Sequence, residues 1–458
     1  MITIFIFYFW AWFCIHSQLT LATAHSQFTT QQNMLQINFI RENKEKTILG
    51  LQKKHFPNAV EVVENILNLD IKRREAQKQQ DDALQEANTL AKQIGILMKE
   101  GKKEAAENAK TNAKELSNKA QEFSKQFDEI EAEYNKILIK LPNLPHTSVP
   151  TGRTPQENET IFEFGTIPNL PENALPHWDI ITKYDIIDFE LGNKVTGAGF
   201  PFYKGKGAKL QRALINFFLD EAEKAGYTEI QPPILINSAS GFGTGQLPDK
   251  DGQMYHDSAD DLYLIPTAEV PITNMFRDVI VDIKDLPLKN AGYTPCFRRE
   301  AGSWGADVRG LNRLHQFDKI EIVQVAHPEK SYEILEEMRL YVQSILEKLE
   351  LPYRVLRLCG GDMSFTSALT YDLEVYSAAQ KRWLEVSSVS NFETYQANRL
   401  KLRFRGDDKK TQLLHTLNGS ALALPRIVAA LLENNQTEKG INIPKILQPY
   451  TKFEVITN

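Results

Sequence analysis

The segment 296–321 holds the densest set of side chains that could take part in chemistry. Its sequence, CFRREAGSWGADVRGLNRLHQFDKIE, has two strand-like ends and a loop rich in Gly and small residues at 301–310. Alternate residues of a strand share a face, so we expect Arg298 and Glu300 to point the same way. A cation and a carboxylate would then meet on one surface.

At the far end of this segment, the same alternation places Phe317, Lys319 and Glu321 on one face. Together with Arg298, these side chains would suit an anion, an amine and a flat base. Alternating Arg and Glu is also typical of a solvated strand face, and an isolated Phe is typical of a core. Both interpretations stay open on this segment alone.

The composition is ordinary for a globular protein of 458 residues, with 42% hydrophobic residues, 24% charged residues and a net charge of −6. The length suits two or three domains. Mild acidity excludes a general polyanion binder, so any nucleic-acid contact needs a local basic patch. The cysteines at 14, 296 and 359 lack the spacing of a zinc site and are typical of a reducing compartment.

The N-terminus conflicts with a reducing compartment, because residues 1–15 are almost wholly apolar and resemble a signal peptide. However, no Lys or Arg occurs before Arg41, so the positive flank of a signal peptide is missing. Met34 directly precedes amphipathic helical sequence. We therefore expect Met34 to be the functional start and residues 1–33 to be a dispensable or misassigned extension, with secretion as the alternative.

Residues 69–139 show the clearest helical periodicity, in two runs separated near Gly101. Their apolar positions recur in steps of three and four, which predicts an antiparallel coiled coil of two helices. With roughly 30 residues in each helix, this arm would be ~45 Å long. Such an arm could recognise the shape of a partner, or it could be an inert spacer or a dimerisation rod. The seam positions are Leu69, Ala76, Ala83, Ala87, Leu90, Ile94 and Leu97, then Ala106, Ala109, Ala113, Leu116, Ala120, Phe123, Phe127, Ile130, Tyr134 and Ile137.

The rest of the chain predicts an α+β fold with a mostly antiparallel sheet. Amphipathic helices are expected at 209–225 and 331–349, and strand-like runs follow without a regular βαβ alternation. A Pro-rich stretch separates the arm from this region. The predicted domains are the extension 1–33, an N-terminal domain at 34–140, a linker at 141–160 and a catalytic domain at 161–458.

Several motifs along the chain appear in the order found in one enzyme family. They are GYTEIQPP at 226–233, the segment 296–321, NGSALALPR at 418–426, TGQLP at 244–248, TAE at 267–269 and EVSS at 385–388. With the N-terminal arm, they make residues 34–455 resemble bacterial-type seryl-tRNA synthetases, which are class II aminoacyl-tRNA synthetases. The resemblance implies a class II antiparallel sheet with flanking helices, preceded by a helical arm.

The resemblance also implies ATP-dependent activation of L-serine to seryl-adenylate and its transfer to tRNA(Ser), and to tRNA(Sec) where present. Arg298 and Arg426 are the expected catalytic residues, since two anions must approach each other. Mg²⁺ would be held by Glu385 and Ser388, and no zinc is expected. The implied ATP-binding residues are Arg298, Arg299, Glu300, Leu314, Phe317, Glu385, Val386, Ser387, Ser388 and Arg426.

For serine, the family's pocket needs an acceptor for the amine and partners for the hydroxyl. The implied serine-binding residues are Thr267, Ala268, Glu269, Glu321 and Ser420. Glu321 is expected to bind both the hydroxyl and the amine. Without the motifs, Thr267 would be an ordinary strand-end residue and Ser420 a helix N-cap.

The implied partners are tRNA(Ser), bound through the arm and with its acceptor end near the loop 301–310, and a second copy of the chain. The first motif is the family's dimer interface, and we expect a cytoplasmic homodimer with no membrane partner. The sequence departs from the family pattern at Arg299, Ala306 and Asn398, and Pro425 falls where it could bend the last helix. These departures concern contacts rather than the reaction.

Two other functions remain as alternatives. An amino-acid ligase that charges a carrier protein would lack the full arm, which is intact here. A synthetase-like scaffold with a dead site would have lost residues such as Arg298, Glu300, Glu385 or Arg426, which are all present. A secreted coiled-coil protein is favoured only by residues 1–33.

Overall fold

The computed structural model describes residues 35–249, 251–300, 309–406 and 409–457. The predicted extension 1–33, the predicted start at Met34 and most of the loop 301–310, including Ala306, lie outside the described residues. The chain divides into two units, and the second, Met34–Asn458, holds all the elements below. None of the helices in the described part combines the length and the apolar character that a membrane span needs.

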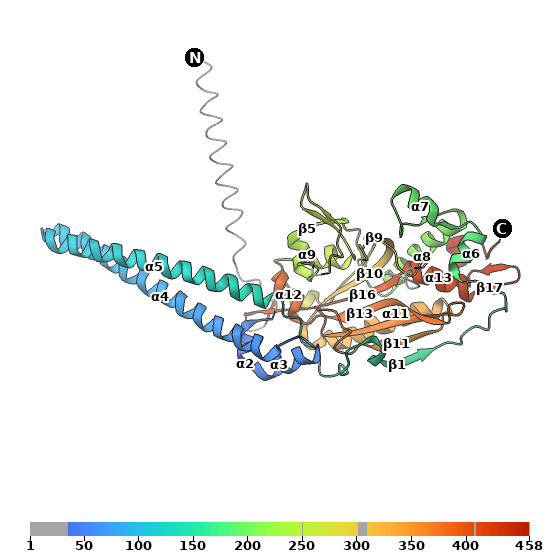
Figure 1. Cartoon of the computed structure of the whole chain (residues 1–458), viewed down its shortest axis with the longest axis horizontal. Helices are drawn as coiled ribbons and strands as arrows, with labels where there is room; N and C mark the ends of the chain where they lie inside the picture. The colour runs from blue at the N-terminus through green and yellow to red at the C-terminus, as the bar shows by residue number, and fades with distance from the viewer. Residues whose placement is uncertain (1–34, 250, 301–308, 407–408, 458) are drawn as a thin grey trace, which may run out of the picture. The chain divides into compact units, whose positions relative to one another are not determined.

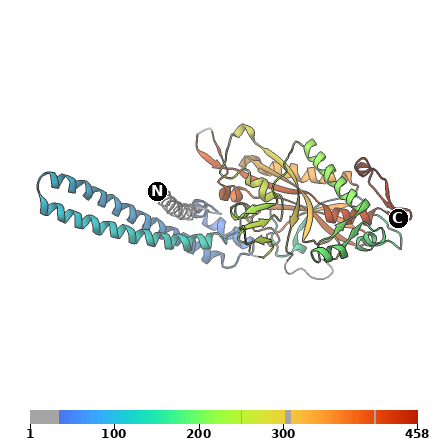
Figure 2. The same ribbon diagram turned by 90° about the horizontal axis from the view of Figure 1, so that it is seen from above.

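The N-terminal part is helical, as the periodicity predicts. Two short helices, α2 (Ile37–Glu42) and α3 (Lys44–Lys53), precede the long α4 (Ala59–Lys99) and α5 (Lys103–Leu138). Figures 1 and 2 show α4 and α5 side by side along their length. The predicted arm is confirmed.

The inward faces of α4 and α5 follow the predicted seam. Small residues supply most of the buried positions, with Ala76, Ala83, Ala106 and Ala120 all below one-tenth exposed. Leu69, Ala109 and Tyr134 are buried as well. The remaining seam positions are half-buried, and most positions between them are exposed. The seam is therefore narrow, and the outer sides of both helices face solvent.

The catalytic part is built on one large sheet with the strand order β1-β11-β12-β13-β16-β10-β9-β4. Neighbouring strands in this sheet are antiparallel, except that β4 and β9 are parallel. The predicted α+β fold with a mostly antiparallel sheet is confirmed. The strands are β1 (Glu159–Phe164), β4 (Thr228–Glu229), β9 (Leu288–Phe297), β10 (Gln316–Ala326), β11 (Tyr353–Arg357), β12 (Leu369–Ser377), β13 (Arg382–Asn391) and β16 (His415–Ala423).

Three helices pack on one face of this sheet, namely α8 (Gly205–Lys224), α11 (Ser331–Lys348) and α13 (Leu424–Asn434). On β10, the even-numbered Ile320 and Ile322 belong to the apolar core with these helices. The odd-numbered residues of the same strand therefore point to the other face, as alternation requires. That free face carries the candidate site.

Smaller elements surround the sheet (Figure 1). The helices are α6 (His177–Lys183), α7 (Phe189–Val195), α9 (Ser238–Thr244), α10 (Glu269–Asn274), α12 (Thr394–Leu400) and α14 (Gln448–Thr451), with 3-10 turns at Pro155–Glu157, Ile283–Asp285, Pro328–Lys330 and Lys445–Leu447. The short strands are β2 (Ile187–Asp188), β3 (Phe202–Tyr203), β5 (Leu235–Asn237), β6 (His256–Asp257), β7 (Leu262–Leu264), β8 (Ile280–Val281), β14 (Arg403–Arg405), β15 (Thr411–Leu413), β17 (Gln436–Thr437), β18 (Gly440–Asn442) and β19 (Val455–Ile456).

Hydrogen bonds join the N-terminal helices to the catalytic part. Lys54, just after α3, donates from Nζ to the carbonyl oxygens of Ser364 and Ser367, both at 2.7 Å. Asn143, in the predicted linker, donates from Nδ2 to the carbonyl oxygen of Phe392 at 2.8 Å. The segment that Lys54 binds also borders the candidate site, because Ser364 lines its cavity.

Candidate active site

A cavity of about 680 Å³ opens on the free face of the large sheet. We call it the active-site cavity. It brings together residues that are far apart in sequence, from β10, β13, β16, α13 and the segments near 245 and 365. The predicted site residues that line it are Thr267, Glu269, Arg298, Glu300, Leu314, Phe317, Glu321, Glu385, Val386, Ser387, Ser388, Ser420 and Arg426.

Two predicted site residues are not among the described residues that line this cavity. Arg299 is exposed, whereas its neighbours Arg298 and Glu300 both line the cavity. Ala268 is fully buried in an apolar cluster with Ile272 and Val323. Any contact from Ala268 to a ligand would come from its backbone.

One end of the active-site cavity is a buried polar pocket. Glu321 is 1% exposed, and its carboxylate lies between the Lys319 ammonium, 2.6 Å from Oε2, and the Asn418 amide, which donates to Oε1 at 2.9 Å. Lys319 also donates to Thr267 Oγ1 at 2.8 Å. Buried charges need such partners, so Lys319 fixes two of the predicted serine-binding residues at once. Alternation on the strand placed Lys319 on this face, but no motif assigned it to a ligand.

Glu269 is the second buried carboxyl group of this pocket. Burial, and then the nearby charge of Glu321, raise the pKa of Glu269 to about 7. Gln396, on α12, donates to Glu269 Oε1 at 2.7 Å, and its own Oε1 accepts from Thr416 Oγ1 at 2.7 Å. The amide of Gln396 is thus fixed in one orientation. Nothing in the sequence pattern singled out this glutamine.

Arg298 and Glu300 lie on the same side of the cavity, as predicted, although the strand ends before them. The Arg298 guanidinium lies over the Phe317 ring, 5.2 Å from its centroid, and its Nε donates to the Pro266 carbonyl at 3.4 Å. Glu300 accepts from Arg313 Nη1 at 2.9 Å. This region combines a cation, an aromatic face and a carboxylate.

A β-bulge brings Glu385 and Ser388 to one face of β13. Residues three apart on a regular strand face opposite sides, but the pairing of β13 with β12 skips one residue here. Val386 and Val389 both pack into the apolar core, which shows the same extra residue between them. The bulge therefore turns both Glu385 and Ser388 toward the cavity.

The oxygen donors at this bulge fit Mg²⁺, which prefers hard oxygen ligands and few protein contacts. Glu385 and Ser388 supply a half-exposed carboxylate and a hydroxyl. Asp372, which pairs with Ser388 across the sheet, adds a carboxyl group whose pKa is raised by burial and by the charge of Glu385. Because the charge of Glu385 disfavours ionisation of Asp372, a bound cation would relieve the repulsion, and the site therefore favours one.

Arg426 lies in the first turn of α13 and reaches the same cavity. Its Nη1 donates to the Glu385 carbonyl at 2.7 Å, and its Nε donates to the Asn312 carbonyl at 3.0 Å. Pro425 occupies the first turn, where a missing N–H costs nothing, so it starts the helix rather than bending it. Asn398 is not among the described residues that line the cavity, whereas its neighbour Arg399 is.

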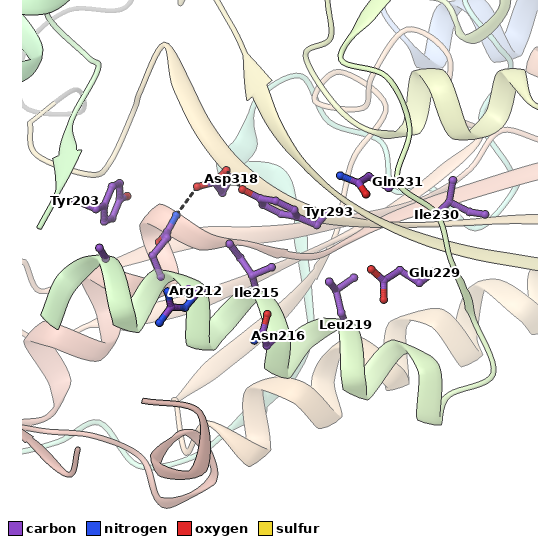
Figure 3. A pocket seen from close by; sticks show the side chains of 12 residues that line it. Tyr203, Arg212, Ile215, Asn216, Leu219, Glu229, Ile230, Gln231, Tyr293 and Asp318 are labelled. Atoms are coloured by element: carbon purple, nitrogen blue, oxygen red, sulfur yellow. Dashed lines mark hydrogen bonds between the residues drawn. The ribbon is translucent and has the colours of Figure 1, made fainter. Parts of the chain in front are cut away.

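A second cavity, of about 550 Å³, lies between α8 and the strands β4, β9 and β10. Figure 3 shows Ile215 and Leu219 on α8 facing Tyr293 and Asp318 on the sheet. Asp318 accepts a hydrogen bond from Tyr293 Oη at 2.9 Å and another from Gln211 Nε2, on α8, at 2.8 Å. The second cavity lies on the helix-covered side and is separate from the active-site cavity.

Comparison with known proteins supplies the family. The model of the seryl-tRNA synthetase N-terminal domain matches residues 34–145, and that of the class II tRNA synthetase core domain (G, H, P, S and T) matches residues 253–435. A serine–tRNA ligase of Salinibacter ruber is 50% identical over 422 residues, which cover 92% of this chain and 98% of that protein. The chain belongs to the seryl-tRNA synthetase family.

Solved seryl-tRNA synthetases share the fold over nearly the whole chain. The Pyrococcus horikoshii enzyme complexed with ATP has 34% identity and a TM-score of 0.87, covering 92% of this chain and 99% of that one. The cytoplasmic serine–tRNA ligase of Naegleria fowleri in complex with AMP has 27% identity and a TM-score of 0.82, covering 92% and 98%. The class II motifs of this seryl-tRNA synthetase homologue therefore lie in the architecture that its relatives use.

Proposed function

We propose that this protein is a serine–tRNA ligase that activates L-serine with ATP and transfers it to tRNA(Ser) at the active-site cavity. One observation carries the proposal: a single cavity unites two arginines with a buried pocket of two carboxylates. The arginines suit phosphate and carboxylate anions, and the pocket suits a small amino acid. The 50% identity to a serine–tRNA ligase supports the same reaction.

In the first step, a carboxylate oxygen of serine attacks the α-phosphorus of ATP, and the bond to the bridging oxygen breaks to release pyrophosphate. The serine carboxylate is already ionised at neutral pH, so no general base is required. Arg298 neutralises both anions as they approach, and Arg426 binds the outer phosphates. Phe317 stacks on adenine, and Glu300 accepts from its amino group.

Glu385 and Ser388 would hold Mg²⁺, which supplies charge neutralisation on the phosphates when bound. The bulge turns both oxygens toward the cavity, at the end where we place the phosphates. The protein contributes the positions of these groups, because Arg426 donates a hydrogen bond to the backbone carbonyl of Glu385. The cation ligands and the outer-phosphate arginine are thus set relative to each other.

Serine recognition follows from the buried pocket. The ammonium group of serine meets the carboxylates of Glu321 and Glu269, and its hydroxyl meets Glu321, with Thr267 and Ser420 close by. Alanine is rejected because the buried partners of the hydroxyl would be left unpaired. Threonine is excluded by the size of the pocket.

In the second step, the terminal ribose hydroxyl of tRNA attacks the activated carbonyl, and AMP leaves. The exposed sides of α4 and α5 bind the tRNA body by shape and backbone contacts. tRNA(Sec) is a further acceptor where the host has it. The acceptor end enters beside the segment 301–310.

We also propose a homodimer through α8 and β4. β4 is an exposed edge strand, and the neighbouring second cavity presents half-buried apolar side chains, including Ile215, Leu219 and Ile230 (Figure 3). A second copy would cover both the edge and these residues. Sedimentation equilibrium at micromolar concentration tests this, since a species of one chain mass would contradict it.

Pyrophosphate exchange into ATP, measured with each amino acid in turn, tests the activation step. We expect exchange with serine and its loss by on the order of 100-fold or more in Arg298→Ala, because a preorganised cation is removed from the developing charge. Arg299→Ala, one residue along and exposed, is the matched control and should keep most of the activity. Full exchange in Arg298→Ala would refute the role given to that arginine. Exchange without tRNA charging would favour a carrier-protein ligase.

A further inference from the structure

A buried polar network joins the two ends of helix α13. Glu433, in the last turn, is fully buried, and its Oε1 accepts from the His177 ring Nδ1 at 2.7 Å and from Gln380 Nε2 at 2.9 Å. The backbone N–H of His177 and the hydroxyl of Ser377 donate to the same carboxylate. These donors outweigh the effect of burial and lower the pKa of Glu433, so the carboxylate stays charged.

The partners of His177 fix its tautomer. Its Nε2 lies 2.8 Å from the backbone nitrogen of Leu311, and a backbone N–H can only donate. Nε2 is therefore the acceptor, and Nδ1 carries the proton that is donated to Glu433. Gly310 makes this contact possible, because a Cβ at that position would lie 2.3 Å from Nε2.

A second branch of the network runs through Gln380. Its Nε2 donates to Glu433, and its Oε1 accepts from Asn312 Nδ2 at 3.0 Å. The carbonyl oxygen of Asn312 then accepts from Arg426 Nε. Both branches thus start at Glu433, near the end of α13. The first holds Leu311 and the second holds Asn312, whose carbonyl oxygen binds Arg426 at the beginning of the same helix.

We propose that His177, Gln380 and Glu433 are positioning residues for the activation step. None of the three is among the described residues that line the active-site cavity, so they act through Asn312 on Arg426. The Asn312 and Glu385 carbonyls hold two of the three guanidinium nitrogens of Arg426. The network fixes the first of these anchors, and thereby the direction of the guanidinium. This inference rests on the proposed role of Arg426 at the outer phosphates.

Two substitutions at His177 separate this role from a general effect on folding. Glutamine can place an amide oxygen where Nε2 lies and so keep an acceptor for Leu311, while asparagine places its amide near Nδ1 and keeps only the Glu433 contact. Both remove one buried hydrogen bond and should lower the melting temperature. Only His177→Asn releases the segment that anchors Arg426.

Pyrophosphate exchange with serine is the readout. In His177→Asn we expect the KM values for ATP and pyrophosphate to rise about tenfold, the KM for serine to stay within about twofold, and His177→Gln to stay within about threefold of wild type for all three. The affinity for 5′-O-[N-(L-seryl)sulfamoyl]adenosine, which lacks the outer phosphates, should be unchanged in both. Equal KM changes in the two variants, or a serine KM that rises with that of ATP, would overturn the proposal.

Gln380→Met provides a second test should the His177 variants fail to fold, because Gln380 is only half-buried. It removes the Asn312 branch alone, and the KM for ATP should rise about threefold with the serine KM unchanged. An unchanged KM for ATP would overturn the role of this branch. The wild-type protein separates the two proposals: absence of serine-dependent exchange there contradicts the function itself, whereas normal exchange with unaffected variants contradicts only the positioning role.

Discussion

Glu269 has a buried carboxyl group that must be ionised to bind an ammonium group. Its pKa is raised to about 7 by burial and by Glu321, although the Gln396 amide and two nearby cations act in the opposite direction. The group is therefore only partly ionised at neutral pH. Serine recognition should depend on pH in a range where ATP recognition does not.

We predict that the KM for serine in pyrophosphate exchange falls as pH rises through 7. If only the ionised carboxylate binds serine, the affinity at pH 8 should exceed that at pH 6 by about tenfold, because the ionised fraction changes by that factor across a pKa near 7. The KM for ATP over the same range is the internal control. Glu269→Gln should bind serine more weakly and without this pH dependence. A flat serine profile in the wild-type protein would contradict the assignment.

The raised pKa of Glu269 affects the stability of the fold in the opposite direction to serine binding: stability falls as pH rises. Because the folded pKa of Glu269 is raised, its contribution to stability is fully present below the unfolded pKa of about 4.3 and is lost as pH rises through 7. The ionised form of the pocket proposed to bind serine is thus the less stable form of the fold. Substrate binding compensates for this cost.

The sequence could supply the identities of the site residues but only part of their geometry. Alternation on β10 correctly grouped Phe317 with Glu321. Glu385 and Ser388 violate alternation, and only the family motif paired them, because the bulge depends on the register with β12. Gln396 had no signal, since a glutamine on a short helix acquires its role only from the carboxylate that the fold brings beside it.

At the scale of elements, the periodicity located both long helices, and the first of them extends beyond its predicted seam toward the N-terminus. α4 starts at Ala59, ten residues before the first predicted seam position. Its first turns pack into a globular cluster with α2, α3 and the end of α5 rather than into the seam, so their apolar pattern is broader than a heptad. The apolar pattern of a helix depends on what packs against it. Along α4 this changes from a cluster of several helices to α5 alone.

Lys54 yields a prediction about how the elements are joined. Lys54→Met should lower the free energy of unfolding by roughly 1–3 kcal/mol, because the carbonyl oxygens of Ser364 and Ser367 lose the half-buried donor that bonds to both of them. Urea denaturation measures this. The control is Lys53→Met, whose Nζ makes one longer bond, 3.3 Å to the exposed Thr147 carbonyl, and whose effect should be within about 0.5 kcal/mol. Equal effects would show that the Lys54 bonds carry no particular weight.

At the scale of the whole molecule, the arm should be needed for tRNA charging only. We predict that replacing residues 78–127 with a short Gly-Ser turn leaves serine-dependent exchange within about threefold of wild type while tRNA aminoacylation falls by on the order of 100-fold or more, because the phosphate and shape contacts are lost. The cut keeps the base of the arm, where Arg73 pairs with Glu131 and Tyr134 is buried. Normal charging by the shortened protein would contradict the proposed role of the arm.

The overall topology is the part of the fold that local patterns could least supply. The strand at the end of the segment 296–321 was predicted and is β10, yet the sheet order places β16 between β13 and β10. The pairing of β16 with β10 joins segments about a hundred residues apart, so it cannot be predicted from the local sequence pattern. It is also the pairing that sets Ser420 opposite Glu321 in the serine pocket.

The extra residue in β13 means that this strand could lose one residue and still present the same two oxygens. Deleting one residue between Glu385 and Ser388 would leave them two apart, and regular alternation would turn both toward the cavity. Regular pairing at the present length would instead leave them three apart, and either the carboxylate or the hydroxyl would turn toward the apolar helices. At this position a deletion of one codon is therefore less harmful than a substitution that removes the bulge.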